Sequence, residues 1–275
     1  YAQFSKPLDN YGFWSADIPN TWKRKRDEVV SIPYLTRVSE APIIKDQTEL
    51  EGKHLGFFTE FPTTKDEEVT LKVGISFVDL EGAENNFKSE IAQKNFNQIR
   101  QDAKEAWDKE LSRIKISGGT KDQKTIFYTS LYHTMIDPRI YTAVDGRYVG
   151  GDGKIYSDST FTKRPIFSGW DVFRSQFPLQ TVLNPELVND QLNSLITLAD
   201  QSGRGYYERW EIMNAYSGCM IGNPALSVLA DAYVKGIRGY DIEKAYQYAV
   251  NTSKKFGNDS LGYTASSLGI SHTLE

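Results

Sequence analysis

Residues 210–241 read WEIMNAYSGCMIGNPALSVLADAYVKGIRGYD, a polar and aromatic loop followed by a well-marked helix. Pro224 suits the first turn of that helix, because the amide hydrogen that proline lacks would have no intrahelical partner there. Gly236 and Gly239 are typical of its end. Helical spacing predicts one buried face, made of Ala225, Val228, Leu229, Ala232 and Tyr233. We therefore expect a loop held at the N-terminal end of a buried helix, which either builds a site or packs as a plain corner.

The composition excludes several classes of protein. In 275 residues, 32 Lys and Arg stand against 36 Asp and Glu, a net charge of −4 that is unlike the basic excess of nucleic-acid binders. Aromatic residues make up 13%, which is typical of sugar-binding proteins as well as of aromatic cores. No run approaches the roughly 20 apolar residues of a membrane-spanning helix. Because the chain has no initial methionine or signal-like segment and stops in mid-sequence, we expect it to be a piece of a longer protein.

The first 76 residues are typical of β-structure. Short apolar runs bounded by Pro, Gly, Asn and Asp predict strands at Val29–Val30, Ile32–Leu35, Leu55–Phe61 and Val69–Phe77. In the last run, alternation predicts that Leu71, Val73, Ile75 and Phe77 form a half-buried face. Trp14 and Trp22 lie in loop-like surroundings, where core packing is favoured over an exposed sugar platform.

Helices follow from about Gly82. The absence of Pro and Gly between Ala83 and Leu111 predicts one long helix or two joined helices. The apolar residues of that stretch at loosely helical spacing are Phe87, Ile91, Ile99, Ala103, Ala106 and Trp107.

The remaining chain alternates helices with long loops. Asp122 is the predicted N-cap of a helix reaching Pro138, with a buried stripe of Ile126, Phe127, Leu131 and Met135. Asp145-Gly146 and Asp152-Gly153 predict the turns of a small hairpin, and 187–199 is helical. Helix pairs without alternating strands predict an all-α second domain.

Trp170, Asp171 and Arg174 are the first candidate site residues. On a helix, Asp171 and Arg174 would lie near one face beside the Trp170 indole. A carboxylate, a guanidinium and an indole together are suited to gripping a sugar, although a local salt bridge with a packed indole explains the same pattern. His133 and Asp137 have a metal-pair spacing without a third ligand, so a structural histidine is favoured. Cys219, the single cysteine, shows no partner signature of a nucleophile.

Several motifs occur together and in order, and they resemble glycoside hydrolase family 92, the calcium-dependent, inverting exo-α-mannosidases. The motifs are VGISFVDLEGAENNF (73–87), GGTKDQKTIFYTSLYHTMIDPR (118–139), DGRYVGGDG (145–153), FSGWDVFRSQFPL (167–179), the stretch 210–241, and the terminal SHTLE. The resemblance implies the end of an N-terminal β-sandwich over 1–81, a helical linker over 82–117, and the first part of an (α/α)6-barrel catalytic domain over 118–275.

The sequence differs from the family pattern at the position that the resemblance assigns to the general acid. The family's Gly-Asn-Glu-Thr-Asn-like run before CMIG corresponds here to residues 214–218, so the general-acid glutamate is replaced by Tyr216. A phenol with a pKa near 10 is a poor proton donor at neutral pH. The family's base aspartates would lie beyond Glu275, which aligns with a calcium ligand of the family.

The resemblance leaves three interpretations open. The protein cleaves substrates with good leaving groups, such as mannose-1-phosphodiesters; or Glu208 or Glu211 has taken over as the acid; or the protein is a non-catalytic mannoside-binding member. The residues expected to bind substrate are Trp170, Asp171, Arg174, Trp210, Glu211 and Tyr216. The implied cofactor is Ca2+, the implied partner is a mannose-containing glycan, and the implied location is the bacterial periplasm or the exterior.

Overall fold

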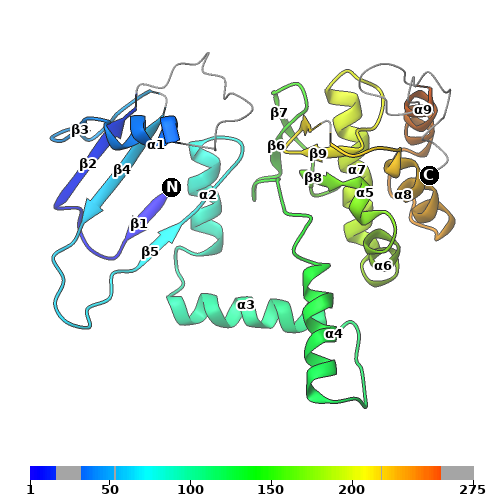
Figure 1. The fold of residues 1–275 in the computed structure, drawn as a ribbon, viewed down its shortest axis with the longest axis horizontal. Helices are drawn as coiled ribbons and strands as arrows, with labels where there is room; N and C mark the ends of the chain where they lie inside the picture. Colours follow the sequence, from blue (N-terminus) through cyan, green and yellow to red (C-terminus); the bar gives the residue numbers. More distant parts are fainter. Residues whose placement is uncertain (17–31, 53, 218, 255–275) are drawn as a thin grey trace. The chain divides into compact units, whose positions relative to one another are not determined.

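The structure is a computed structural model that describes residues 1–16, 32–52, 54–217 and 219–254 (Figure 1). Trp22, the predicted strand at Val29–Val30, and Glu275 lie outside the described residues. The chain divides into two compact units, one of residues 2–73 and one of Tyr1 with the residues from Gly74 onward. Each unit is described by itself below.

The described residues of the N-terminal unit form two small antiparallel sheets and one helix. In one sheet β2 lies between β3 and β4, and in the other β1 pairs with β5. Trp14 in β2 lies opposite Gly56 in β4, and a side chain at Gly56 would fall 1.9 Å from the indole. This half-buried tryptophan therefore packs over its own sheet. The elements are β1 (Ala2–Phe4), β2 (Asn10–Ser15), α1 (Ile32–Ser39), β3 (Ile43–Ile44), β4 (Leu55–Glu60) and β5 (Leu71–Val73).

Two strand predictions in this unit need correction. The run Ile32–Leu35 is not a strand but the start of α1, because a short apolar run fits either structure and Pro33 is tolerated in a first helical turn. The strand predicted over Val69–Phe77 is only β5, and Leu71, Val73, Ile75 and Phe77 are all exposed. The chain leaves the sheet at Gly74, where a side chain would fall 2.6 Å from Cβ of Phe87.

The predicted linker consists of two helices, α2 (Leu80–Glu90) and α3 (Phe96–Leu111). Asn95 and Gln98 form a capping box at the start of α3. This cap marks a new helix start, which explains why α2 and α3 are separate helices. Of the predicted apolar stripe, Phe87 is buried, whereas α3 has no buried residue in the described chain. Trp107 instead makes a ring contact with Tyr132, with centroids 4.5 Å apart.

Helix α4 (Lys121–His133) begins and ends earlier than predicted. Its N-cap is Thr120 rather than Asp122, because Thr120 and Gln123 complete a capping box. Leu131 is buried, but Ile126 is 66% exposed, so the predicted stripe is covered only at its C-terminal end. The hairpin predicted from Asp152-Gly153 is present as β6 (Arg147–Val149) paired with β7 (Ile155–Ser157).

In the described part of the second unit, the main core lies among the helices that follow the β6–β7 hairpin. These and the neighbouring strands are β8 (Ile166–Ser168), α5 (Gly169–Val172), α6 (Gln176–Leu183), α7 (Pro185–Gln201), β9 (Trp210–Ile212), β10 (Ala215–Tyr216), α8 (Pro224–Val234) and α9 (Ile242–Ser253). Val188 and Leu192 of α7 are fully buried in a hydrophobic cluster to which α6, α8 and α9 also contribute residues. The predicted helix from Pro224, with Gly236 in the left-handed conformation after it, is confirmed, although Tyr233 is exposed rather than buried.

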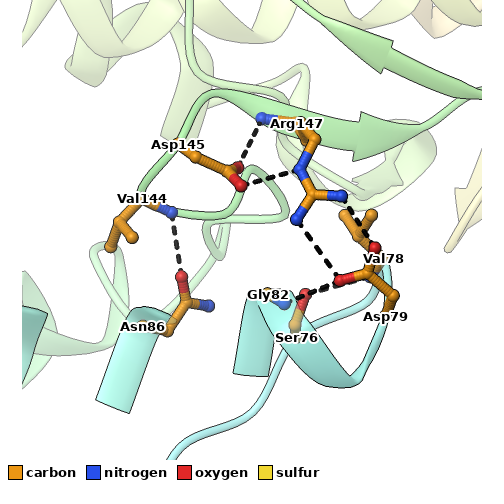
Figure 2. Close-up of polar contacts among 8 residues, drawn as sticks. All are labelled: Ser76, Val78, Asp79, Gly82, Asn86, Val144, Asp145 and Arg147. Atoms are coloured by element: carbon orange, nitrogen blue, oxygen red, sulfur yellow. Dashed lines mark hydrogen bonds and ion pairs between the residues drawn. The ribbon is translucent and has the colours of Figure 1, made fainter. Parts of the chain in front are cut away.

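A polar cluster joins α2 to the loop before β6 (Figure 2). Arg147 donates hydrogen bonds to Asp79, the N-cap of α2, at 2.7 Å, and to Asp145 at 2.7 Å. The Val144 amide donates to Asn86 at 2.9 Å, which adds a second tie between the same segments. The Arg147 guanidinium lowers the pKa of both carboxyl groups, so both stay ionised at neutral pH. These contacts hold the VDLEGAENNF and DGRYVGG motifs together.

Candidate active site

The motif segments FSGWD and WEIMNAY meet in one three-stranded antiparallel sheet, ordered β10–β9–β8. Figure 1 shows β8 beside β9. Ser168 in β8 lies opposite Trp210 in β9, and Phe167 lies opposite Glu211. On the other side of β9, Glu211 lies opposite Tyr216 in β10. Strand pairing therefore brings together segments that are about 40 residues apart in the sequence.

Gly169 fixes how this sheet joins the helices. A side chain there would fall 2.6 Å from the Arg209 carbonyl oxygen and 2.5 Å from Cγ of Pro224. Real Cβ atoms do not come that close to a backbone atom, so only glycine fits. The start of α5 is thus seated against both the strand that carries Trp210 and the start of α8.

Trp170 presents a partly exposed indole at the start of α5, with 37% of its surface accessible. The Arg174 guanidinium carbon lies 4.4 Å from the centroids of both Trp170 and Phe173, and Arg174 donates to the Trp170 carbonyl at 2.7 Å. The prediction that Asp171 and Arg174 share a helix face is wrong, because α5 ends at Val172. Asp171 instead accepts a hydrogen bond from the Ser168 hydroxyl.

The sheet separates two of the predicted substrate-binding residues. Trp210 and Glu211 are adjacent in β9, and successive side chains of a strand point to opposite faces. Trp210 is half-buried on the face of Ser168, whereas Glu211 shares its face with Phe167 and Tyr216. Glu211 is only 1% exposed, so its carboxyl group lies inside the protein rather than at the surface.

Glu211 belongs to a buried group of titratable side chains that the sequence did not predict. Burial raises the pKa of Glu211, while the Lys163 ammonium and the Asn214 amide counteract that rise. Lys163 is fully buried, which lowers its pKa, and the charge of Glu211 opposes the lowering. The pKa of Tyr141 is raised by burial and by the Glu211 charge. These directions are those expected for ionisable groups in a low-dielectric interior.

Tyr216 has a cationic neighbour. It is half-buried, and the guanidinium carbon of Arg209 lies 5.7 Å from its ring centroid. Arg209 itself is 8% exposed. Arg209 belongs to no recognisable motif spacing, so its position over the Tyr216 ring could not be predicted from the sequence.

Glu208, the other candidate acid, is 3% exposed at the end of the loop after α7. Its carboxylate is engaged in an ion pair with Arg204, four residues earlier. An open depression of about 710 Å³ lies elsewhere, along α4, and is lined by Lys121, Lys124, Tyr128 and Tyr132 among others. It includes none of the predicted site residues.

Within residues 1–16, 32–52, 54–217 and 219–254, no group of three or more His, Cys, Asp or Glu side chains could hold a metal ion. The described residues therefore do not by themselves fit a calcium site, and Glu275, the predicted ligand, lies outside them. Cys219 and His133 are both exposed.

Comparison with known proteins identifies the family. The model of the glycosyl hydrolase family 92 catalytic domain matches residues 82–275. A curated relative from Arthroderma benhamiae (strain ATCC MYA-4681 / CBS 112371), described as an uncharacterized secreted glycosidase, is 29% identical over 192 residues, covering 68% of this chain and 20% of that protein.

Two solved structures from Bacteroides thetaiotaomicron are similar to the chain. The family GH92 alpha-mannosidase BT3965 is 30% identical with a TM-score of 0.76, covering 93% of this chain and 32% of that one. The family GH92 inverting mannosidase BT2199 is 27% identical with a TM-score of 0.78, covering 95% and 33%. The chain thus spans a fifth to a third of the length of these relatives. The chain shares a mixed β and helical structure with these proteins. The chain belongs to glycosyl hydrolase family 92.

Proposed function

We propose that the chain is part of a calcium-dependent, inverting α-mannosidase that acts on mannose-containing glycans, with Tyr216 at the position of the family's general acid. The observation that carries this proposal is the β10–β9–β8 sheet, which puts Tyr216 in the same small sheet as the segment leading to Trp170. In the proposed organisation, 1–81 belongs to a β-sandwich, 82–117 is the linker, and 118–275 begins an (α/α)6 barrel.

The relatives support the choice of substrate. Two structures similar to this chain are those of proteins described as mannosidases, and that of BT3965 was also solved with mannoimidazole, at 31% identity to this chain and a TM-score of 0.75. Trp170 offers an indole face suited to the apolar C–H surface of a sugar, and the Asp171 carboxylate can accept hydrogen bonds from hydroxyl groups. We propose that these two residues contact the mannose, with Arg174 beside them, whereas Trp210 lies on the face of the sheet opposite to Tyr216.

Hydrolysis with inversion requires an attacking water, a base and an acid, each with a defined task. A water oxygen adds to the anomeric carbon while the bond to the leaving-group oxygen breaks on the opposite face of the ring. A base takes a proton from the water, and an acid normally gives one to the departing oxygen. With a phenol at Tyr216, departure of a sugar alkoxide lacks an efficient proton donor.

A leaving group that departs as a stable anion removes this difficulty. The phosphate of a mannose-1-phosphodiester leaves without protonation, and the Arg209 guanidinium next to Tyr216 supplies a positive charge suited to it. We therefore propose mannosyl phosphodiesters as the alternative substrate class. Replacement of the acid by Glu208 or Glu211 is less well supported, because Glu208 is paired with Arg204 and Glu211 is buried.

Calcium and location complete the proposal. Calcium would supply a hard cation for sugar hydroxyl groups when bound. Its ligands would include Glu275. The curated relative is described as a secreted glycosidase, which supports a periplasmic or secreted location. No helix within the described part of the chain is long and apolar enough to span a membrane.

The full-length protein, assayed on an α-1,2-mannobioside and on a mannose-1-phosphate diester, tests the function. We expect the diester to be cleaved about 10²- to 10⁴-fold faster, the range that general acid catalysis contributes. A chelator should abolish cleavage, and added Ca2+ but not Mg2+ should restore it.

Each other outcome has a definite meaning. Rapid cleavage of the mannobioside would show that another carboxylate serves as the acid, and Glu208→Gln and Glu211→Gln would identify it. Cleavage of neither substrate would contradict the proposed enzyme and leave a mannoside-binding protein. Cleavage that is insensitive to the chelator would contradict the metal.

A further inference from the structure

Asn214 lies two residues before Tyr216, in the turn of the β9–β10 hairpin. Together with Met213 it joins the two strands, and the φ angles of Met213 and Asn214 are +53° and +66°. Most residues adopt this left-handed conformation only at a cost, although asparagine tolerates it. A turn of this kind persists where surrounding contacts hold it, so those contacts set the place of Tyr216.

The Asn214 side chain contacts a segment that is remote in the sequence. Its amide nitrogen donates a hydrogen bond to the Val149 carbonyl at 2.8 Å and a longer one to the Gly150 carbonyl at 3.4 Å. Val149 is the last residue of β6, and Gly150 follows it. The side-chain amide of Asn214 therefore connects the hairpin that carries Tyr216 to the end of β6.

Two further hydrogen bonds use the backbone of the turn. The Met213 amide donates to the Pro165 carbonyl at 2.7 Å, and the Asn214 amide donates to the Glu211 carboxylate at 3.2 Å. Neither bond needs the Asn214 side chain, because every residue except proline supplies a backbone amide. The contact with β6 can therefore be removed by substitution while both backbone bonds keep their donors.

The segment that Asn214 contacts is itself anchored to α7. Tyr148 of β6 is 3% exposed, and its hydroxyl accepts a hydrogen bond from the Gln201 side chain of α7 at 3.2 Å. A side chain at Gly151 would fall 3.0 Å from the amide nitrogen of Ser202, the C-cap of α7. The turn after β6 thus packs directly against the end of α7, so Asn214 ties the hairpin to a well-packed part of the unit.

We propose that Asn214 is a positioning residue, whose side-chain amide holds the β9–β10 hairpin against β6 and thereby fixes the location of position 216. Asn214 acts through the hairpin and not on the reacting atoms. Its importance for catalysis rests on the proposed function, whereas its hold on the hairpin does not.

Hydrogen–deuterium exchange of the full-length protein tests this hold without relying on activity. Asn214→Gly keeps a residue suited to the left-handed turn and both backbone donors, but it removes the side-chain amide. Amides of residues 215–217 should then exchange about two- to tenfold faster, the factor expected for the loss of one net hydrogen bond. Amides of α9 should stay unchanged.

Met213→Gly is the matched control. It introduces the same glycine flexibility at the neighbouring left-handed position, where the side chain is 37% exposed, and it keeps the backbone donor to Pro165. The freedom that glycine adds to the open state is offset by relief of the left-handed strain, so exchange at 215–217 should stay close to that of the wild type.

Asn214→Asp separates the amide donor from the size of the side chain. Aspartate is similar in shape and tolerates the turn, but its ionised carboxylate only accepts hydrogen bonds and would face two carbonyl groups. Above pH 7, this variant should lose at least as much protection at 215–217 as Asn214→Gly.

Four results would overturn the proposal. They are unchanged exchange at 215–217 in Asn214→Gly, an equal increase in the two glycine variants, an equal increase throughout the protein, and full protection in Asn214→Asp. Each would show that the donor at Asn214 does not hold the hairpin.

Kinetics test whether this positioning matters for catalysis. In a Tyr216→Glu background, adding Asn214→Gly should lower mannobioside cleavage about tenfold or more, mainly through kcat, because a misplaced carboxyl group donates its proton poorly. Adding Met213→Gly should leave that activity unchanged. An equal loss in both double variants, or a loss in KM alone, would overturn the positioning role. If Tyr216→Glu brings no activity, the proposed function fails, and the exchange experiment still decides this inference.

Discussion

Tyr216→Glu is expected to raise kcat/KM for an α-1,2-mannobioside by about 10²- to 10⁴-fold, because in the proposed function the change restores a carboxyl proton donor at the position of the general acid. Tyr216 is half-buried at the end of β10, so glutamate, which is smaller, fits without displacing the sheet. The phenol of tyrosine titrates near pH 10, whereas a carboxylic acid can be tuned into the range where it donates readily.

The pH dependence of this variant gives a second check. An acid works only while protonated, so the gained activity should fall as the pH rises through the pKa of the new carboxyl group. Arg209, 5.7 Å from the present ring, favours the ionised form and should place that fall on the acidic side of neutrality. Tyr216→Gln, which fills similar space without a proton to donate, should show no gain. Equal activity of the Glu and Gln variants would contradict the role assigned to position 216.

Leu192→Ala is expected to lower the free energy of unfolding of the helical unit by about 2–5 kcal/mol, the range for large-to-small changes in well-packed cores. Leu192 is fully buried in the middle of α7, in the cluster that joins α6, α8 and α9. The loss should be measured by urea unfolding followed by helical circular dichroism.

Leu80→Ala provides a matched control, because Leu80 is 87% exposed at the start of α2. It should change the unfolding free energy by no more than about 0.5 kcal/mol. Similar losses for the two variants would show that the cluster around α7 is not the core on which the site is built.

The helices of the second unit were predictable because their signals are local. Asn223-Pro224 and Gly236 mark the ends of α8 within a residue or two, and apolar spacing marked most of its buried side, while 187–199 was predicted as helical and is part of α7. Predictions that depended on distant partners did less well. The run Ile32–Leu35 fits a strand or a helix, and only its neighbours make it the start of α1.

In the candidate site, too, some features follow from local sequence signals and others depend on residues that are distant in the sequence. Motif order predicted Trp170 and Tyr216 as site residues, which stays a prediction, and strand pairing brings their segments together around one sheet. The opposite orientation of Trp210 and Glu211 follows from strand alternation, which the three-residue strand β9 was too short to reveal in the sequence. Lys163 could not be predicted, since burial of a lysine depends on α7 and Glu211, which are remote in sequence.

The central claim is that Tyr216 leaves the enzyme without an efficient general acid, and the dependence of rate on the leaving group tests it most directly. The measurement is kcat/KM of the full-length wild-type protein for a series of α-mannosides whose leaving groups range in pKa from about 4 to about 10, with Ca2+ present. We predict a steep fall in kcat/KM as the leaving-group pKa rises, because the departing oxygen carries its negative charge away unprotonated. A rate that is independent of leaving-group pKa, with Tyr216→Phe unchanged, would show that a proton donor is present and would contradict the claim.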